Sequence, residues 1–391
     1  DRQRRGTSVD RRTRGTPRID RGGGGVNTTV VDNIGELVTN DPDVGEGDVG
    51  LLHDVSVVLG GGRVLSIGPR GQTADDRIDA QGRCVLPGFV DSHTHLVFAG
   101  DRAEEFTRRM AGEPYDGGGI RFTTELTRQT SADDLRRLLD RRLREVHRAG
   151  TTTIEIKSGY GLSVDSERLQ TGVARAVTPE ATFLGAHVVP AEFEGRSDEY
   201  VDLVCGSMLD AVAPNVRWVD AFCETGAFTG EQSRAILAAG RDRGLGLRLH
   251  ANQLGEGPGV RLGVEMGCAS VDHCTHMTDA DIDALAGSST VATYLPATDF
   301  STRQPYPDAR RALDAGVRVA LASNCNPGSS YTSSMSFCIA LAVRDMHMSI
   351  DQAITAATLG GALALRRDDV GRIVVGGPAH LTILDAPNRH H

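Results

Sequence analysis

The chain has 391 residues, of which 39% are hydrophobic and 24% charged, a composition typical of a soluble globular protein. Its formal net charge of −10 excludes nucleic acid as the main partner, because phosphate binding requires a basic face. The sequence contains no apolar run near the roughly 18 residues of a membrane-spanning helix, which excludes a membrane protein. The length predicts one large domain and a smaller one, since barrels of about 250 residues fold as single units.

The two ends of the chain differ from its middle. Residues 1–25 contain eight arginines and almost no apolar side chains, which predicts a disordered tail. Residues 26–85 contain short β-branched runs separated by glycines, as in DVSVVLGGGRVLSIG, a pattern typical of hairpins. Residues 369–391 have the same character, so we expect the two segments to form one small β domain. Because the sequence ends on a strand-like pattern, we expect the chain to continue past His391.

Residues 86–368 alternate apolar runs with helical patterns, such as SADDLRRLLDRRLREVHRAG at 131–150, which has an acidic start and a closing glycine. Eight strands, each followed by a helix, predict a (β/α)8 TIM-type barrel. A doubly wound sheet is the alternative, but no G-x-G-x-x-G follows the first run. Further helices are predicted at 197–212, 229–244 and 308–316. Strands are predicted at 86–92, 152–156, 181–186, 217–222, 246–250, 269–273, 290–295 and 317–322.

The seven cysteines are widely spaced and include no C-x-x-C pair. This pattern is typical neither of a disulfide framework nor of a zinc knuckle. It predicts reduced thiols and a cytoplasmic location.

Polar residues follow most of the predicted strands, which is where a barrel places its active site. His93 and His95 come at the end of the first strand, and their spacing of two puts both imidazoles on one face. His250 and His273 end the fifth and sixth strands. Neutral imidazoles suit zinc or iron, so the pattern predicts a metal centre.

This arrangement resembles the amidohydrolase superfamily, which has H-x-H on strand 1, one histidine each on strands 5 and 6, and an aspartate on strand 8. The segments LPGFVDSHTHLVFAGDRAEEF, TTTIEIKSGYGL, FLGAHVVP, FCETGAFT, LRLHANQLG, VDHCTH and NPGSS resemble one branch of it over roughly residues 30–388. That resemblance implies hydrolysis of the cyclic amide of 4-imidazolone-5-propanoate to N-formimidoyl-L-glutamate, a step of histidine degradation.

The resemblance also implies roles for individual residues, and one zinc or iron ion per subunit. It makes His273, Gln253 and Asn324 the catalytic residues. The implied metal ligands are His93, His95, His250 and Asn324. The implied substrate contacts are Arg102, Tyr160, His187, Gln253, Asn326, Gly328 and Ser329.

Physical chemistry supports two of these contacts. Arg102 carries a planar, permanently charged fork that can hold the propanoate carboxylate with two hydrogen bonds. The turn at 326–330 precedes a helix predicted to start near Ser333, and open backbone amides there would bind an anion.

The chain departs from the superfamily pattern at position 324, where Asn324 stands in place of an aspartate. A neutral carboxamide is a poor metal ligand and accepts no proton near pH 7. Gln253 likewise replaces a glutamate found in some relatives. We therefore expect metal binding to persist through three histidines and turnover to fall, by about 10²–10⁴-fold for a lost general base. The carboxylates Glu224, Glu256 and Asp272 are nearby in the sequence, but the pattern does not place them.

A carboxylated lysine bridging two metals belongs on strand 4 in this superfamily. The only lysine, Lys157, follows strand 2, which favours a single metal. Two alternatives to the hydrolase stay open: an aminohydrolase acting on another heterocycle, and a barrel that binds its ligand without turnover. In each case the expected partner is a small molecule, and the resemblance implies a homodimer.

Overall fold

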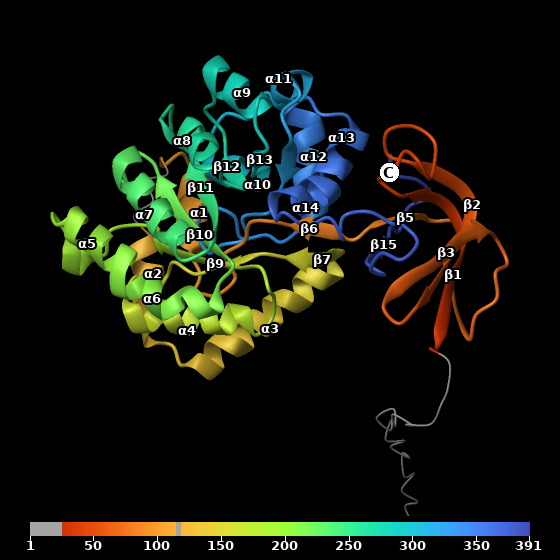
Figure 1. Cartoon of the computed structure of the whole chain (residues 1–391), viewed down its shortest axis with the longest axis horizontal. Coiled ribbons are helices and arrows are strands. Elements are labelled where there is room, and N and C mark those ends of the chain that lie inside the picture. Colours follow the sequence, from red (N-terminus) through yellow and green to blue (C-terminus); the bar gives the residue numbers. More distant parts are fainter. Residues whose placement is uncertain (1–25, 115–118) are drawn as a thin grey trace, which may run out of the picture.

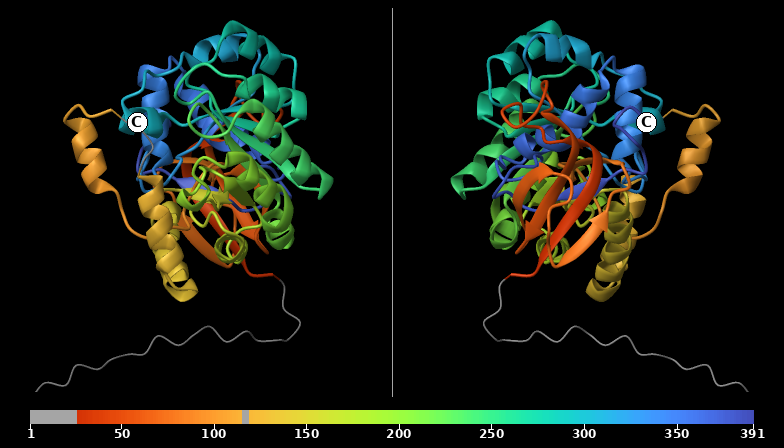
Figure 2. Two further views of the ribbon diagram at one scale, coloured as in Figure 1. Left: turned by 90° about the vertical axis from the view of Figure 1, so that its left-hand side faces the viewer. Right: turned by 90° about the vertical axis from the view of Figure 1, so that its right-hand side faces the viewer.

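The computed structural model describes residues 26–114 and 119–391, so the prediction of a disordered tail at 1–25 lies outside the described residues. The chain forms a barrel and, at one end of it, a small β domain (Figure 1). Figure 2 shows the small sheet behind the barrel in one view and in front of it in the other.

The small β domain is a six-stranded sheet, in which the N-terminal strands pair with a strand from the C-terminal end of the chain. Leu381–Ile383 lies antiparallel to Val85–Pro87, so the predicted pairing of the two chain ends is confirmed. The long strand β1 contains a register shift between Val31 and Ile34. The strands are β1 (Thr28–Val38), β2 (Leu51–Gly60), β3 (Arg63–Pro69), β4 (Asp76–Asp79), β5 (Cys84–Pro87) and β15 (Leu381–Ile383).

The barrel strands are all parallel and follow chain order, as a TIM-type barrel requires. The second strand is interrupted at Glu155, whose backbone amide donates to the Asp91 carbonyl. The ring closes where the backbone amide of Asn324 donates to the His93 carbonyl at 3.0 Å. The strands are β6 (Phe89–Asp91), β7 (Thr151–Ile154), β8 (Ile156–Lys157), β9 (Ala181–Ala186), β10 (Trp218–Cys223), β11 (Gly246–Ala251), β12 (Ser270–His273), β13 (Val291–Tyr294) and β14 (Val319–Leu321).

The predicted first strand, 86–92, is divided between the two sheets. Residues up to Pro87 belong to β5, and β6 begins only at Phe89. The amide of Gly88, between them, donates back to the small domain at His380, and the Phe89 amide donates to Gly150 of the barrel. The single apolar run at 86–92 therefore contains two short strands that belong to different sheets, and the sequence pattern does not mark the boundary between them.

Helices cover the outside of the barrel (Figures 1 and 2). Their ends follow local chemistry: Ser131 caps α3, and Thr229 with Gln232 forms a capping box on α7. The predicted helix 197–212 contains a π-helical turn, Val204–Met208. The helices are α1 (Ala103–Met110), α2 (Ile120–Gln129), α3 (Ala132–Arg148), α4 (Val164–Arg175), α5 (Ser197–Leu203), α6 (Leu209–Val212), α7 (Gly230–Asp242), α8 (Gly259–Met266), α9 (Asp279–Ala286), α10 (Pro296–Thr302), α11 (Ala309–Asp314), α12 (Met335–Asp345), α13 (Ile350–Thr355) and α14 (Gly361–Ala364).

Two adjacent glycines let the start of α14 approach the barrel wall. A Cβ atom on Gly360 would lie 2.2 Å from the Val319 carbonyl oxygen, and one on Gly361 would lie 2.2 Å from that of Val90. Val319 is on β14 and Val90 on β6, the strands that close the ring. Backbone atoms cannot move aside as a flexible side chain can, so both positions require glycine.

We therefore expect Gly361→Ala to destabilise the protein by at least about 1–3 kcal/mol, the usual cost of overpacking a core. The free energy of unfolding from chemical denaturation measures this. Gly172→Ala is the matched control, because Gly172 is also in a helix and the nearest atom to an added Cβ, on Asn215, lies 3.9 Å away. There the higher helix propensity of alanine should leave stability unchanged or raised. Equal destabilisation by both variants would contradict this account.

Candidate active site and metal centre

Three histidines meet at the C-terminal end of the barrel strands. His93 and His95 follow β6, and His250 lies on β11. All three are buried, and one ligand atom from each lies within 4.8 Å of the others. The Nε2 atoms of His93 and His95 are 3.3 Å apart, and the rings of His93 and His250 are 4.5 Å apart. Distant parts of the chain thus supply a compact nitrogen cluster.

Carboxylates orient two of these three rings. His93 Nδ1 lies 2.8 Å from Asp272 Oδ2, and His250 Nδ1 lies 3.1 Å from Asp220 Oδ1. With Nδ1 donating to a carboxylate, Nε2 carries the lone pair that binds a metal. Among the described residues, His250 Nε2 and His95 Nδ1 are buried and have no hydrogen-bond partner. The lone-pair arrangement fits a metal ion.

The protonation states agree with this fit. Burial lowers the pKa of His93 and His95 well below its usual range, so both are neutral at pH 7. Burial by itself would raise the pKa of Asp272 and of Asp220. The cationic Arg248 beside Asp272, and His250 with Lys157 beside Asp220, outweigh it and hold both pKa values below their usual range. The site therefore combines the neutral imidazoles of His93 and His95 with ionised carboxylates behind the cluster.

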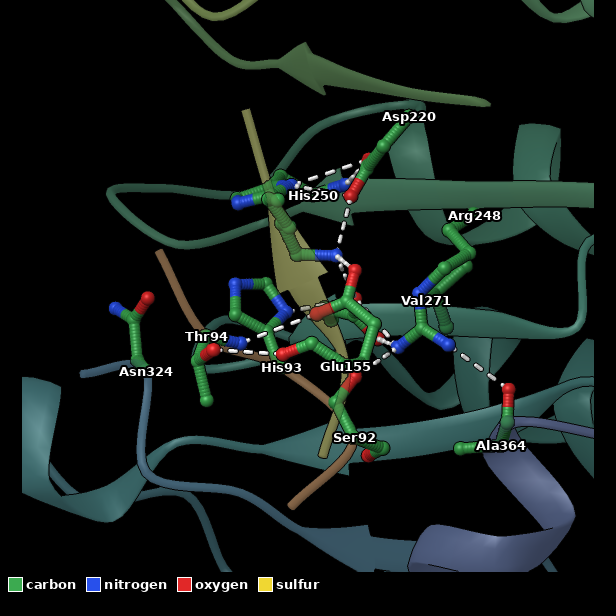
Figure 3. A network of polar contacts seen from close by, with 12 residues as sticks. Ser92, His93, Thr94, Glu155, Asp220, Arg248, His250, Val271, Asn324 and Ala364 are labelled. Carbon is green, nitrogen blue, oxygen red and sulfur yellow. Dashed lines mark hydrogen bonds and ion pairs between the residues drawn. The ribbon is translucent and has the colours of Figure 1, made fainter. Parts of the chain in front are cut away.

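A buried network of charged side chains lies behind the histidines, with Glu155, Asp220 and Arg248 among its members (Figure 3). The Lys157 ammonium joins two of its carboxylates, at 2.9 Å from Glu155 Oε1 and 2.9 Å from Asp220 Oδ2. Arg248 contacts Asp272 at 3.2 Å. All of these side chains are completely buried. Three acidic groups share two cations, so a bound divalent cation would be electrostatically favoured.

Asn324 lies on the opposite side of His93 from Arg248 in Figure 3. Its backbone is left-handed, with φ of 52°, and its Nδ2 donates to Thr298 Oγ1 at 2.7 Å. Its Oδ1 is buried and has no hydrogen-bond partner in the described chain. A carbonyl oxygen in this state can face a ligand or a cation, but it cannot take up a proton.

His273 lies against the cluster, with its ring 5.3 Å from that of His250 and 5.7 Å from that of His93. Burial and the neighbouring histidines lower its pKa well below the usual range, so it is neutral at pH 7. Its backbone has φ of 82°, a rare conformation for a residue with a side chain. Such strain is typical of functional sites.

The loop after β11 carries Gln253, which is buried. Its backbone amide and that of Leu254 donate to Glu224 Oε2 at 2.8 and 2.9 Å. Glu224 therefore holds this loop, and Asp272 holds His93. Glu256 is exposed. Of the three carboxylates that the sequence did not place, Glu224 therefore anchors a loop, Asp272 pairs with a histidine, and Glu256 lies on the surface.

Tyr160 and His187 form a wall next to His95. The His187 ring stacks on that of His95 at 5.4 Å, and Tyr160 meets His187 edge-on at 5.3 Å. His187 Nδ1 donates to the Gly159 carbonyl at 3.0 Å, which leaves Nε2 as an acceptor. Burial and the nearby His250 lower the pKa of His187 to about 4, so this ring is also neutral.

The buried glutamate Glu167 holds the loop that carries Tyr160. Its Oε1 accepts from the amides of Gly161 and Leu162, each at 2.8 Å. The Tyr160 amide donates to Gln170 Oε1 at 3.2 Å. Both acceptors are on α4, so this helix positions the loop.

Arg102 is buried, and it forms a two-pronged ion pair with Glu105 at 2.9 and 2.6 Å. Its guanidinium packs on Gly328, where a Cβ atom would lie 2.1 Å from Nη1. The glycine is therefore needed for this close approach.

The turn at 326–330 differs from the open amide nest expected from the sequence. Asn326 Oδ1 accepts from the amides of Gly328 and Ser329, both at 2.8 Å. Asn326 Nδ2 donates to Ser329 Oγ at 2.8 Å. The amides expected to bind an anion are thus used inside the turn, because an asparagine side chain folds back onto the backbone two and three residues later.

Sequence reasoning gave no role to Glu155, Asp220, Arg248 or Glu167. A signal was present for the first three, since Glu155-x-Lys157, Asp220 and Arg248-x-His250 place charges within otherwise apolar barrel strands. Charges on the inner face of a strand must be paired, so they indicate a network. Nothing in the pattern indicated Glu167, which acts from a helix on a distant loop.

We expect Asp220→Asn to weaken metal binding by about 10–100-fold, because it loosens the orientation of His250 and weakens its charge-assisted hydrogen bond. Competition with a chelator, read out as bound metal per chain, measures this. Asp210→Asn is the control, because Asp210 is exposed and pairs with Arg243 on the surface. Unchanged metal retention in Asp220→Asn would show that this carboxylate does not support the centre.

Known proteins resemble this chain over most of its length. The imidazolonepropionase of Salinispora tropica is 62% identical over 370 residues, covering 94% of each chain. That of Mycolicibacterium smegmatis is 58% identical, covering 93% of this chain and 92% of its own. Atrazine chlorohydrolase TrzN from Arthrobacter aurescens, complexed with zinc, has a TM-score of 0.65 at 19% identity over 90% of this chain and 86% of its own.

An adenosine deaminase from Xanthomonas campestris with bound zinc has a TM-score of 0.63 at 18% identity over 91% of this chain and 84% of its own. At such identity the two solved structures establish the fold alone, which agrees with the predicted barrel. The profile described as the amidohydrolase family matches residues 84–390. The chain therefore belongs to the amidohydrolase family and, within it, to the imidazolonepropionases.

Proposed function

We propose that this chain hydrolyses the cyclic amide of 4-imidazolone-5-propanoate to N-formimidoyl-L-glutamate. The observation that carries the proposal is the convergence of His93, His95 and His250 at the barrel mouth, with His273 and Asn324 beside them. The high identity to imidazolonepropionases supports this substrate. The alternatives, an aminohydrolase for another heterocycle and a non-catalytic binder, gain no support from these relatives.

We propose one zinc or iron ion per subunit, held by His93, His95 and His250, with Asn324 as a weak fourth ligand. Such an ion supplies Lewis acidity and makes hydroxide available near neutral pH. The neutral imidazole of His273 would hydrogen-bond the carbonyl oxygen as negative charge develops on it. Tyr160 and His187 would line the ring of the substrate, and Gln253 would contact it from the loop after β11.

The propanoate would bind next to Arg102, at the turn formed by Asn326, Gly328 and Ser329. Arg102 already pairs with Glu105, so a substrate carboxylate would share this guanidinium or displace Glu105. Because Asn326 occupies two amides of the turn, its own side chain and the hydroxyl of Ser329 would supply the contacts there.

No helix in the described chain is long and apolar enough to cross a membrane. All seven cysteines lie in the described residues and are free thiols. Burial raises the pKa of several of them, to about 12 for Cys325, so they are unreactive. Free thiols suit a reducing compartment, so we propose that the protein acts in the cytoplasm. We also propose that it forms a homodimer, as the resemblance to the family implies.

Position 324 decides how fast the reaction proceeds. We expect Asn324→Asp to raise turnover by about 10²–10⁴-fold, because it restores a carboxylate that can move a proton. Hydrolysis of imidazolone propanoate and metal content are measured on the same samples of both chains. Similar rates at equal metal content would mean that another group carries the proton. No hydrolysis by either metal-loaded chain would overturn the substrate assignment.

The loop carrying Tyr160 offers a second test. We expect Glu167→Gln to raise KM by about tenfold, with a smaller effect on kcat, because neutral acceptors hold amides less strongly than a carboxylate does. Steady-state kinetics in the Asn324→Asp background measures this. Asp165→Asn is the control on the same helix, since the Asp165 side chain is 92% exposed. An unchanged KM in Glu167→Gln would mean that α4 does not position the substrate wall.

A further inference from the structure

Asp299 is a buried acid near the site to which the proposed reaction gives no role. It lies in α10, the helix after β13, and only 1% of the residue is exposed. Its Oδ1 accepts a hydrogen bond from the Thr275 hydroxyl at 2.9 Å. Its Oδ2 is buried and has no partner within the described part of the chain. A buried carboxylate with one neutral donor and no cation is strongly disfavoured, so the geometry favours the protonated acid.

Asp299 and the preceding residue, Thr298, contact two of the loops that form the site. Thr275 is two residues after His273, and Asp299 holds it. Thr298 Oγ1 accepts from Asn324 Nδ2 at 2.7 Å. One short helix thus connects the loop after β12 with the loop after β14.

The loop after β12 needs such an anchor. His273 and Cys274 both have left-handed backbones, with φ of 82° and 55°. Residues with side chains adopt this conformation only where the surrounding structure holds them in it. The amide of Cys274 donates to Ala251, and the side-chain bond from Thr275 to Asp299 ties the loop on its other side.

We propose that Asp299 is a positioning residue, held as an uncharged carboxylic acid, that ties the loop carrying His273 to α10. Its effect on catalysis rests on the proposed function, because it acts through His273. Its protonation state and its contact with Thr275 do not depend on that function.

Among the residues that the structure describes, none places a compensating positive charge beside Asp299. Burial raises its pKa to about 8, against a smaller opposing effect of the Thr275 hydroxyl. The titratable groups that face it are Cys274 and Tyr306, and Asp299 contributes to raising the pKa of each. Helices α1 and α12 pack on α10, and within the described residues neither forms an ion pair with Asp299. Ionisation would therefore leave an isolated negative charge.

A proton held by Asp299 in the folded state makes the stability of the protein depend on pH. The pKa of Asp299 is higher in the folded state than the ordinary 3.8 of an aspartate, so between these values the folded state binds the proton that the unfolded state has lost. The contribution of Asp299 to stability therefore decreases as pH rises to about 8, and stays constant above that pH. Asparagine has the same shape and does not ionise, so Asp299→Asn removes this dependence.

The test compares the metal-loaded parent chain with Asp299→Asn in thermal unfolding from pH 5 to 9.5. We expect the melting temperature of the variant, relative to the parent, to rise by on the order of 2 °C per pH unit up to about pH 8 and then level off. Asp283→Asn is the control, because Asp283 is exposed on α9 and should give no such trend. A constant difference between Asp299→Asn and the parent at every pH would mean that Asp299 is ionised in the fold, and would overturn the proposal.

The positioning role has its own readout, kinetics in the Asn324→Asp background. The parent should lose kcat as pH rises through about 8, and Asp299→Asn should not. Thr275→Val, which removes the hydroxyl while keeping the shape, should lower kcat more than it changes KM at every pH. Identical pH profiles with and without Asp299 would overturn the positioning role. Absence of hydrolysis in all chains, with the stability trend present, would refute the proposed function and leave the protonated acid supported.

Discussion

The ammonium of Lys157, buried between Glu155 and Asp220, is the interaction on which the site depends. Without it, Glu155 and Asp220 would lose the buried cation that contacts both of them, at a cost of several kcal/mol. With it, Asp220 stays ionised and orients His250, while Arg248 does the same for Asp272 and His93. The network therefore sets the direction in which the imidazole lone pairs point.

The candidate metal ligands and Asn324 are held by different contacts. Two of the three histidines, His93 and His250, have a carboxylate on Nδ1. Asn324 stands where the proposed reaction needs a group that moves a proton. Asn324 donates a hydrogen bond to Thr298 and closes the ring through His93, so the structure accommodates its side chain well. This side chain cannot take up a proton, because an amide oxygen has almost no basicity at neutral pH.

Two neutral buried rings, His187 and His273, lie against the histidine cluster. His187 and His273 are uncharged because burial disfavours the imidazolium, and Asp299 has no cation near it within the described residues. Uncharged groups donate and accept hydrogen bonds without adding a fixed charge to the pocket. The ionised carboxylates of Asp220 and Asp272 lie behind the histidines, and the neutral imidazoles of His187 and His273 lie against them.

Sequence alone determined the barrel and the identity of the histidines, because strand periodicity and strand-end polarity are local features. H-x-H at 93–95 and the isolated His250 and His273 follow from position on a strand and need no tertiary information. Sequence could not place Glu224 or Asp272, or foresee that Asn326 would use the turn amides, since each depends on a partner brought close by folding. Nor could it separate β5 from β6 in one apolar run. Charge pairing and the protonation of Asp299 depend on burial and distance in three dimensions, so only the tertiary structure decided them.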